Sequence, residues 1–519
     1  MKLFKAMATV GGFTGASRIL GFVRDILTAA ILGAGPIADA FFVALKMPNL
    51  FRRITAEGAF SVAFVPLYTK TMEEDGQEKA SLFASNAFAM MVAILVPFTI
   101  LAVIVMPYII YAIAPGFIDD PLRYDLAVNL SRITFPYLLM MSLTALLGGV
   151  LNAHNKFAPF AAAPILFNLS LIIALLFFTK FTDNAGYAMA YGIVFAGVAQ
   201  LILLFYFIFR NNIKITFKSP ELTPRIKKTF RLMGPGVIGA GVMQINLFVD
   251  MIIASLLSAG SISYLYYADR LNQLPLSMIG IAVGTALLPM LSKVVASKDM
   301  VEANKLFNRS LEIALLLALP AAVALFTIPE TLIGTLFERG EFAPEDTMIA
   351  SNVLMGYAIG LPAYICSKIF STAYWSRQDT MGPVKISIII TLINIALSLA
   401  LIVPFGVAGI AVSTGLVGWL QLALLYRGVK KEGTLNFDKK FKSAIFKILF
   451  STLLMAVILL VFDKYYGVYD ALSDGSKIFR LFVLVFIGMG VYAAGILGSG
   501  AVKISEIKKV FKKGNVKNV

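Results

Sequence analysis

Residues 17–70 read SRILGFVRDILTAAILGAGPIADAFFVALKMPNLFRRITAEGAFSVAFVPLYTK, two apolar helical runs separated by the turn-like residues 33–36. A charge inside a membrane-length run costs at least about 2.5 kcal/mol, so it persists mainly where it faces a watery cavity or a partner. Charged residues of both signs recur through this stretch, and their number predicts a cavity. They are Arg18, Arg24, Asp25, Asp39, Lys46, Arg52, Arg53 and Glu57.

The composition of the whole chain is that of a membrane protein. Hydrophobic side chains make up 59% of its 519 residues and charged ones only 14%. Apolar runs of about 20 residues recur along its length, which predicts an all-α polytopic membrane protein. The single cysteine, Cys366, and the single histidine, His154, exclude an internal disulfide and a histidine- or cysteine-rich zinc site.

The basic residues predict how the chain crosses the membrane. Fourteen apolar runs can be placed, and alternate connections hold 31 lysines and arginines on one side against 6 on the other. Cytoplasmic loops carry the excess of basic residues, so both termini are expected in the cytoplasm. The net charge of +16 is therefore mostly topogenic, and no nucleic-acid partner is expected.

Two internal matches indicate a duplicated unit. Val65–Lys70 resembles Leu288–Lys293 at an offset of 223 residues, and His154–Pro159 resembles Gln378–Pro383 at an offset of 224. The first match ends the second and the eighth predicted helices. The second match joins the fourth to the fifth helix and the tenth to the eleventh. Both pairs are six helices apart, so a six-helix unit occurs twice. Because six is even, both copies have the same orientation, which predicts two parallel six-helix lobes around a central cavity and alternating access by rocking.

The repeat sets the expected domain boundaries. Residues 1–209 form an N-terminal six-helix lobe, and 210–227 form a basic cytoplasmic linker. Residues 228–429 form the C-terminal six-helix lobe. Residues 430–519 add two helices, which either pack as scaffold or present a groove to a lipid chain, and a basic cytoplasmic tail.

Basic residues outnumber acidic ones inside the predicted helices, which favours an anionic ligand. The guanidinium group is a planar fork that suits phosphate or diphosphate. Beyond the charges of residues 17–70, the helices contain the bases Arg132, Arg270 and Lys368 and the acids Asp250 and Asp269.

Two other interpretations of these residues remain open. The charges could pair internally, as Arg53 with Glu57, Arg24 or Arg18 with Asp25, and Arg270 with Asp269. The polar residues Asp250, Asn394 and Thr414 could instead bind a small cation, although Asn and Thr more often form interhelical hydrogen bonds.

Enzyme motifs are missing from the sequence. It has no phosphate-binding loop ending in Gly-Lys-Ser/Thr, no paired-histidine metal motif and no Gly-x-Ser-x-Gly elbow. The acidic run Glu73–Asp75 is the only one that suits magnesium, and it has the composition of a solvated loop. A transporter is therefore favoured over an enzyme.

Several motifs resemble the MurJ (MviN) family of lipid II flippases, within the multidrug/oligosaccharidyl-lipid/polysaccharide exporter superfamily. The resemblance rests on Ser17–Asp25, Ala38–Phe41, Pro48–Arg53, Glu57–Phe60 and, later in the chain, Tyr267–Arg270 with Gln273–Pro275. It spans essentially the whole chain, including fourteen helices in a six-plus-six-plus-two arrangement.

The resemblance implies a specific function and site. The function is transport of undecaprenyl-diphosphate-MurNAc-pentapeptide-GlcNAc to the outer leaflet of the bacterial inner membrane for peptidoglycan synthesis, with other cell-wall synthesis proteins as candidate partners. Substrate-binding roles fall on Arg18, Arg24, Arg52 and Arg270. Supporting charges are Asp25, Asp39, Lys46, Arg53, Glu57 and Asp269, and the last two helices would hold the polyprenyl tail.

The resemblance leaves the driving force open. No cofactor is expected, but Na⁺ or the membrane potential would drive transport, with Asp250, Asn394 and Thr414 as the Na⁺ ligands. Ser398 stands where a second carboxylate would strengthen such a site.

Two rival functions belong to the same superfamily, namely a flippase for another lipid-linked oligosaccharide and a cation-coupled drug exporter. A rival from another class is a non-transporting scaffold of a cell-wall complex.

Overall fold

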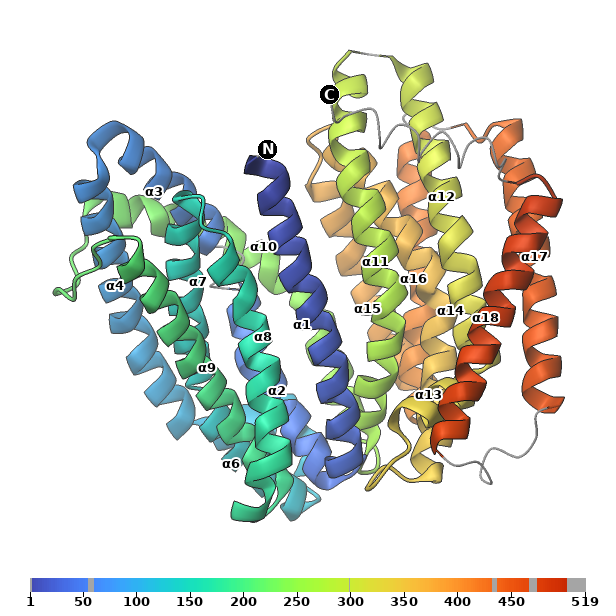
Figure 1. Ribbon diagram of the computed structural model, residues 1–519, viewed down its shortest axis with the longest axis horizontal. Helices are drawn as coiled ribbons and strands as arrows, with labels where there is room; N and C mark the ends of the chain where they lie inside the picture. Colours follow the sequence, from blue (N-terminus) through green and yellow to red (C-terminus); the bar gives the residue numbers. More distant parts are fainter. Residues whose placement is uncertain (1, 55–59, 298, 432–435, 466–473, 502–519) are drawn as a thin grey trace. The chain divides into compact units, whose positions relative to one another are not determined.

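The computed structural model describes residues 2–54, 60–297, 299–431, 436–465 and 474–501, and all regular structure within these ranges is helical (Figure 1). The predicted all-α polytopic fold is confirmed. Ten of the described helical segments are long and apolar enough to cross a membrane. The other four predicted runs are also helical, in α1, α2 with α3, α10 and α11, and they carry most of the intramembrane charges.

The chain packs into two compact units. The first comprises residues up to Ser263 together with Arg339–Ala343, and the second comprises the remainder. The helices of the first unit are α1 (Lys2–Leu32), α2 (Pro36–Ile54), α3 (Ser61–Asp75), α4 (Gln77–Ile104), α5 (Met106–Ile113), α6 (Pro121–Thr134), α7 (Tyr137–Ala153), α8 (Ala158–Ile173), α9 (Ala185–Arg210) and α10 (Pro224–Ser255).

Within the described residues, the second unit continues with eight helices. They are α11 (Ser261–Ala296), whose first turn belongs to the first unit, α12 (Met300–Thr327), α13 (Pro329–Phe337), α14 (Pro344–Trp375), α15 (Met381–Phe405), α16 (Val407–Lys431), α17 (Lys439–Tyr465) and α18 (Asp474–Gly498). Packing thus groups α10 with the first unit, whereas the repeat predicted from the sequence counts it in the second lobe. The two criteria differ, and the repeat boundaries stay a prediction.

Helix α2 is the most buried element near the predicted site. Residues 38–45 are all buried, and the helix packs against α6, α7, α9 and α10. Pro48 lacks the N–H that would bond to the carbonyl of Ala44 four residues earlier. The Thr134 hydroxyl of α6 donates to that carbonyl at 2.9 Å. A neighbouring helix therefore satisfies the group that the proline leaves without its helical donor, as a membrane interior requires.

The turn between α1 and α2 explains why a short distant segment belongs to the first unit. Gly33 has a φ of +65°, and a Cβ added there would lie 2.4 Å from the Glu341 carbonyl oxygen. The Glu341 N–H in turn donates to the Ala30 carbonyl at 2.9 Å. Only glycine permits both the backbone conformation and this approach.

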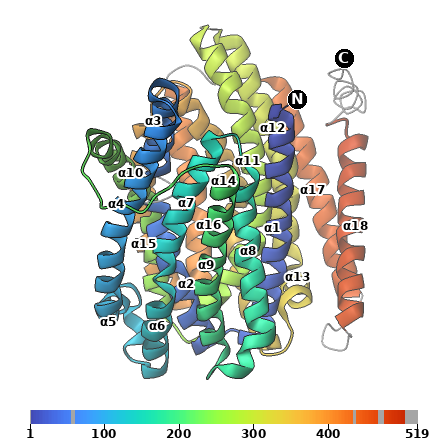
Figure 2. The ribbon, with the colours of Figure 1, turned by 60° about the vertical axis from the view of Figure 1, so that its left-hand side comes forward.

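Each unit contains a pair of helices that pack along each other near the predicted site residues or the predicted lipid-chain groove. In the first unit α1 packs along α8, and in the second α17 packs along α18 and against α12; both pairs can be followed in Figures 1 and 2. Large apolar side chains such as Phe446, Leu453 and Phe486 are exposed on α17 and α18. These surfaces suit contact with lipid.

Candidate functional site: charged residues within the helices

Arg24 lies in a buried polar cluster between α1 and α8. Its Nη2 donates to Asp25 Oδ1 at 2.7 Å, and its Nη1 donates to Asn168 Oδ1 at 2.9 Å. The Asn168 amide then donates to the Ser17 carbonyl at 2.9 Å. The guanidinium carbon also stands 5.7 Å from the centre of the Phe167 ring. The predicted internal pair of Arg24 with Asp25 is therefore present.

This cluster includes a residue that sequence reasoning missed. Asn168 is a buried amide within an otherwise apolar run, and it contacts α1 at both Ser17 and Arg24. The only signal in the sequence was a polar side chain at membrane depth. Its amide also donates to the Ser17 hydroxyl at 3.2 Å, and the three bonds orient the Arg24 guanidinium and fix the packing of α1 on α8.

Arg18 lies on the same helix in a different environment. It is six residues from Arg24 and is exposed, as are Ala16 and Ile19 beside it. Among the described residues, no ion pair involving Arg18 is present within 4.0 Å. Its guanidinium is therefore available to a ligand from outside this helix.

Two bases of α2, Lys46 and Arg52, are half-buried. Arg52 donates from Nε to Asn49 Oδ1 at 3.3 Å, and Lys46 lies about two turns earlier. The predicted partner Glu57 and the side chain of Arg53 lie outside the described residues. The predicted pairing of Arg53 with Glu57 therefore stays a prediction.

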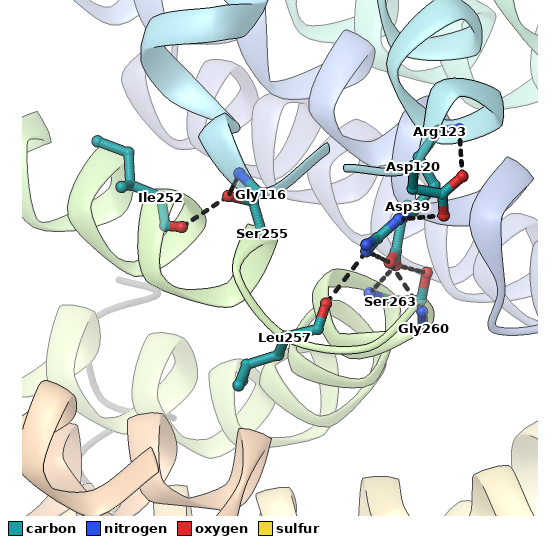
Figure 3. Close-up of polar contacts among 9 residues, drawn as sticks. All are labelled: Asp39, Gly116, Asp120, Arg123, Ile252, Ser255, Leu257, Gly260 and Ser263. Carbon is teal, nitrogen blue, oxygen red and sulfur yellow. Dashed lines mark hydrogen bonds and ion pairs between the residues drawn. The ribbon is translucent and has the colours of Figure 1, made fainter. Parts of the chain in front are cut away.

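Asp39 holds the turn that joins α10 to α11 (Figure 3). Its carboxylate is fully buried and accepts from the Gly260 N–H at 2.7 Å, the Ser263 N–H at 2.9 Å and the Ser263 hydroxyl at 2.6 Å. Carboxylates are favoured at helix N-termini because they satisfy N–H groups that lack a helical acceptor. Asp39 therefore caps α11.

Arg123 completes this polar cluster. One of its nitrogens lies 3.9 Å from Asp39, and its Nε donates to Asp120 at 2.8 Å. It also donates to the Leu257 carbonyl at 3.2 Å and covers the Phe117 ring at 4.8 Å. Sequence reasoning placed Arg123 in an outer loop and assigned it no role. Its chemistry here is to link α6 to the α10–α11 turn.

Arg270 lies in the second unit on α11. Its Nη2 donates to the Tyr266 hydroxyl at 2.7 Å, and its guanidinium carbon lies 4.5 Å from the centre of the same ring. Neighbouring Asp269 accepts from the Gln273 amide. The tyrosine fixes the planar guanidinium in one orientation, which is what recognition of an oxyanion requires.

The candidate cation ligands are distributed between the two units. Asp250 is half-buried in the first, while Asn394 and Thr414 belong to the second. Asn394 Oδ1 accepts from the Ser413 hydroxyl at 2.8 Å, and the Thr414 hydroxyl donates to the Ile410 carbonyl at 2.9 Å. Within the described residues, no group of three or more acidic, histidine or cysteine side chains is close enough to bind a metal.

A pocket accompanies the last two helices. It has a volume of about 390 Å³ and is lined mainly by apolar side chains of α17 and α18, including Phe462, Phe479 and Leu484. Arg480 stands at this pocket and donates to Asp463 at 2.9 Å. An apolar pocket suits a hydrocarbon chain, but binding of the polyprenyl tail stays a prediction.

Known proteins resemble this chain along its whole length. A relative from Rhizobium meliloti (strain 1021), "Probable lipid II flippase MurJ", is 38% identical over 520 residues, covering 99% of this chain and 97% of the relative. A relative from Burkholderia cenocepacia, "Lipid II flippase MurJ", is 34% identical over 437 residues, covering 83% and 85%.

Solved structures show the same fold. "Lipid II flippase MurJ, inward closed conformation" matches with a TM-score of 0.77 and 29% identity, covering 94% of this chain and 97% of that one. An inward-facing multidrug resistance MATE family transporter of the MOP superfamily matches with a TM-score of 0.68 and 14% identity, covering 80% of this chain and 94% of the transporter. This second likeness concerns the fold alone.

The family profile agrees with these relatives. The profile described as "Lipid II flippase MurJ" matches residues 28–474. That range includes Asp39, Arg52 and Arg270 and most of the helices of both units. The chain is therefore a multi-pass membrane protein that belongs to the lipid II flippase MurJ family of transporters, as its motifs predicted.

Proposed function

We propose that this chain moves lipid II from the cytoplasmic to the outer leaflet of the bacterial inner membrane by alternating access. The observation that carries the proposal is the family profile, which matches residues 28–474. The substrate is an amphiphile with an anionic diphosphate, and the intramembrane arginines supply the complementary charge. The chain acts as a transporter, and its product feeds peptidoglycan synthesis.

The contacts of the four arginines suggest a division of labour among them. Arg18 is exposed, Arg52 is half-buried, and Arg270 is oriented by Tyr266. These three guanidiniums would bind the diphosphate directly. Arg24 already donates to Asp25 and Asn168, so its part would be to hold α1 on α8 in the shape that presents Arg18.

The driving force and the orientation complete the proposal. Both termini would lie in the cytoplasm, as the distribution of basic residues predicts. The loaded diphosphate carries charge across the membrane, so the membrane potential would contribute about 2.3 kcal/mol per charge per 100 mV. A Na⁺ ion at Asp250, Asn394 and Thr414 is the alternative source of energy. Contacts with other cell-wall synthesis proteins also remain a proposal.

Rescue of a bacterium depleted of its own flippase tests the proposal. Wild type should restore lipid II at the outer face, and Arg270→Ala expressed to the same level should not. Lys79→Ala is the matched control, because Lys79 is an exposed base at the start of α4 whose ion pair is with Asp75, the last residue of α3, at 3.3 Å. Failure of inserted wild type would reject lipid II and favour another lipid-linked glycan. Rescue by Arg270→Ala would show that Arg270 is not needed to bind the substrate.

A further inference from the structure

The second unit contains an apolar hollow that the proposed transport does not use. It has a volume of about 260 Å³ and lies among α12, α14, α16 and the start of α17. Its walls are almost entirely hydrocarbon and aromatic. They include Leu311, Cys366, Phe370, Trp419, Leu422 and Tyr426.

One wall of the hollow is fixed by hydrogen bonds. The amides of Asn304 and Asn308 both donate to the Asn436 carbonyl, at 3.0 and 2.9 Å, and the Asn436 N–H donates back to Asn304 at 3.0 Å. Asp438 accepts from the Phe441 N–H at 2.6 Å and so caps α17. These bonds hold the segment that begins α17 against α12.

The aromatic rings of this wall are stacked in a row. The Phe437 ring lies 5.5 Å from that of Tyr426 at an interplanar angle of 6°, and 4.9 Å from that of Phe441 at 16°. The ring of Phe370 meets Tyr426 edge-on at 6.0 Å. The stack and the asparagine bonds therefore hold these rings in place as one wall of the hollow.

One face of α16 runs from apolar to charged. Trp419, Leu422, Tyr426 and Lys430 are three or four residues apart and therefore share this face. The first three line the hollow, and the exposed Lys430 ammonium lies 5.7 Å from the centre of the Tyr426 ring. Arg427 and Lys431 on α16 and Lys439 at the start of α17 are also exposed, so these bases outnumber the one exposed acid among the described residues of the same segment, Asp438. An apolar slot with a positive mouth matches an amphiphile with a negative head.

We propose that this hollow binds an anionic phospholipid, with one acyl chain in the slot and the phosphate at Lys430. The bilayer is as apolar as the slot, so the chain gains little from hydrophobic transfer. Selectivity therefore comes from the charge at the mouth, and one lysine near a lipid headgroup corresponds to about a fivefold preference for anionic lipid. The site does not depend on which substrate the protein transports.

Native mass spectrometry of the purified full-length chain tests this proposal. The probes are dioleoyl phosphatidylglycerol, dioleoyl phosphatidylcholine and undecaprenyl phosphate, each added to delipidated protein. Wild type should retain phosphatidylglycerol about fivefold better than phosphatidylcholine, and Lys430→Gln should lose that preference. Lys385→Gln, which removes an exposed base at the start of α15, should keep it.

A second variant tests the slot itself. Leu422→Trp should fill the hollow and reduce retention of both phospholipids, provided that the variant is monodisperse on size-exclusion chromatography. If Leu422→Trp does not fold, the comparison of Lys430→Gln with Lys385→Gln still tests the proposal. Equal retention of both phospholipids by wild type, or an equal loss in Lys430→Gln and Lys385→Gln, would overturn the proposal. Preferential retention of undecaprenyl phosphate would overturn it in favour of a site for the transported lipid.

Discussion

Asp39 and Arg18 are both charged residues of the opening helices, yet their environments are opposite. Asp39 is fully buried and accepts three hydrogen bonds from Gly260 and Ser263. Arg18 is exposed on α1. Both looked alike in the sequence, as charges that interrupt an apolar run. Local donors decide whether such a charge holds the fold together or remains available to a ligand.

Arg24 lies between these two cases. It is buried and ion-paired like Asp39, but it shares α1 with Arg18. Loss of a buried charge leaves its partners without compensation, whereas loss of an exposed charge leaves the fold intact. Stability and transport should therefore respond differently at these three positions.

The largest loss of stability should follow Asp39→Ala. The change leaves the N–H groups of Gly260 and Ser263 without their acceptor and removes one of the two carboxylates beside Arg123, which costs about 3 kcal/mol of unfolding free energy. Thermal unfolding in detergent measures it. Asp119→Ala, at an exposed carboxylate near the same membrane end, is the control. An unchanged unfolding midpoint for Asp39→Ala would mean that the hydrogen bonds from Asp39 to the α10–α11 turn contribute nothing to stability.

A smaller loss, about 2 kcal/mol, should follow Arg24→Ala, because Asp25 and Asn168 lose a charged donor. The double variant Arg24→Ala/Asp25→Ala removes both charges and should be less destabilised than the sum of the two single variants. A coupling energy of about 1 kcal/mol or more in this cycle is expected for charges in contact. If the losses of stability in the two single variants simply add in the double variant, Arg24 and Asp25 do not stabilise the fold through their interaction.

The fold could be predicted from the sequence further than the site could. The apolar runs follow from local chemistry, and the structure confirms that they are helical. The partners of Asp39 are more than 220 residues away, at Gly260 and Ser263, and no local pattern brings them together. The Arg24 partner Asn168 was missed for the same reason. Spacing along a helix gives the face of a charge but not what that face meets.

A mild effect of pH should appear at the turn between α7 and α8. His154 Nε2 lies 3.0 Å from the Tyr68 hydroxyl. Burial, and then the nearby Lys156, lower the pKa of His154 below its usual 6.5. A histidine with a depressed pKa stabilises the folded state above its unfolded pKa of about 6.5 and loses that contribution as pH falls through its lower folded pKa.

The free energy of unfolding of wild type should therefore fall slightly as pH drops from about 7 to about 5. His154→Gln should flatten this part of the profile, because the titrating group is absent. A variant profile that kept the wild-type slope would assign the effect to other groups. Unlike Asp39, this residue should matter only under acid conditions.

The smallest effect on stability should come from Arg18→Ala, and it would separate the two kinds of charge most sharply. The side chain is exposed, so the unfolding free energy should stay within about 0.5 kcal/mol of wild type. Loss of a guanidinium that binds the diphosphate should nevertheless reduce transport about tenfold or more, since charge-assisted hydrogen bonds contribute about 1.5–3 kcal/mol each. Arg18→Lys keeps the charge but not the fork and should recover part of the activity. Equal outer-face lipid II for Arg18→Ala and wild type would show that exposure on α1 does not make this arginine a ligand. Lost stability together with lost transport would instead give Arg18 the structural role of Asp39.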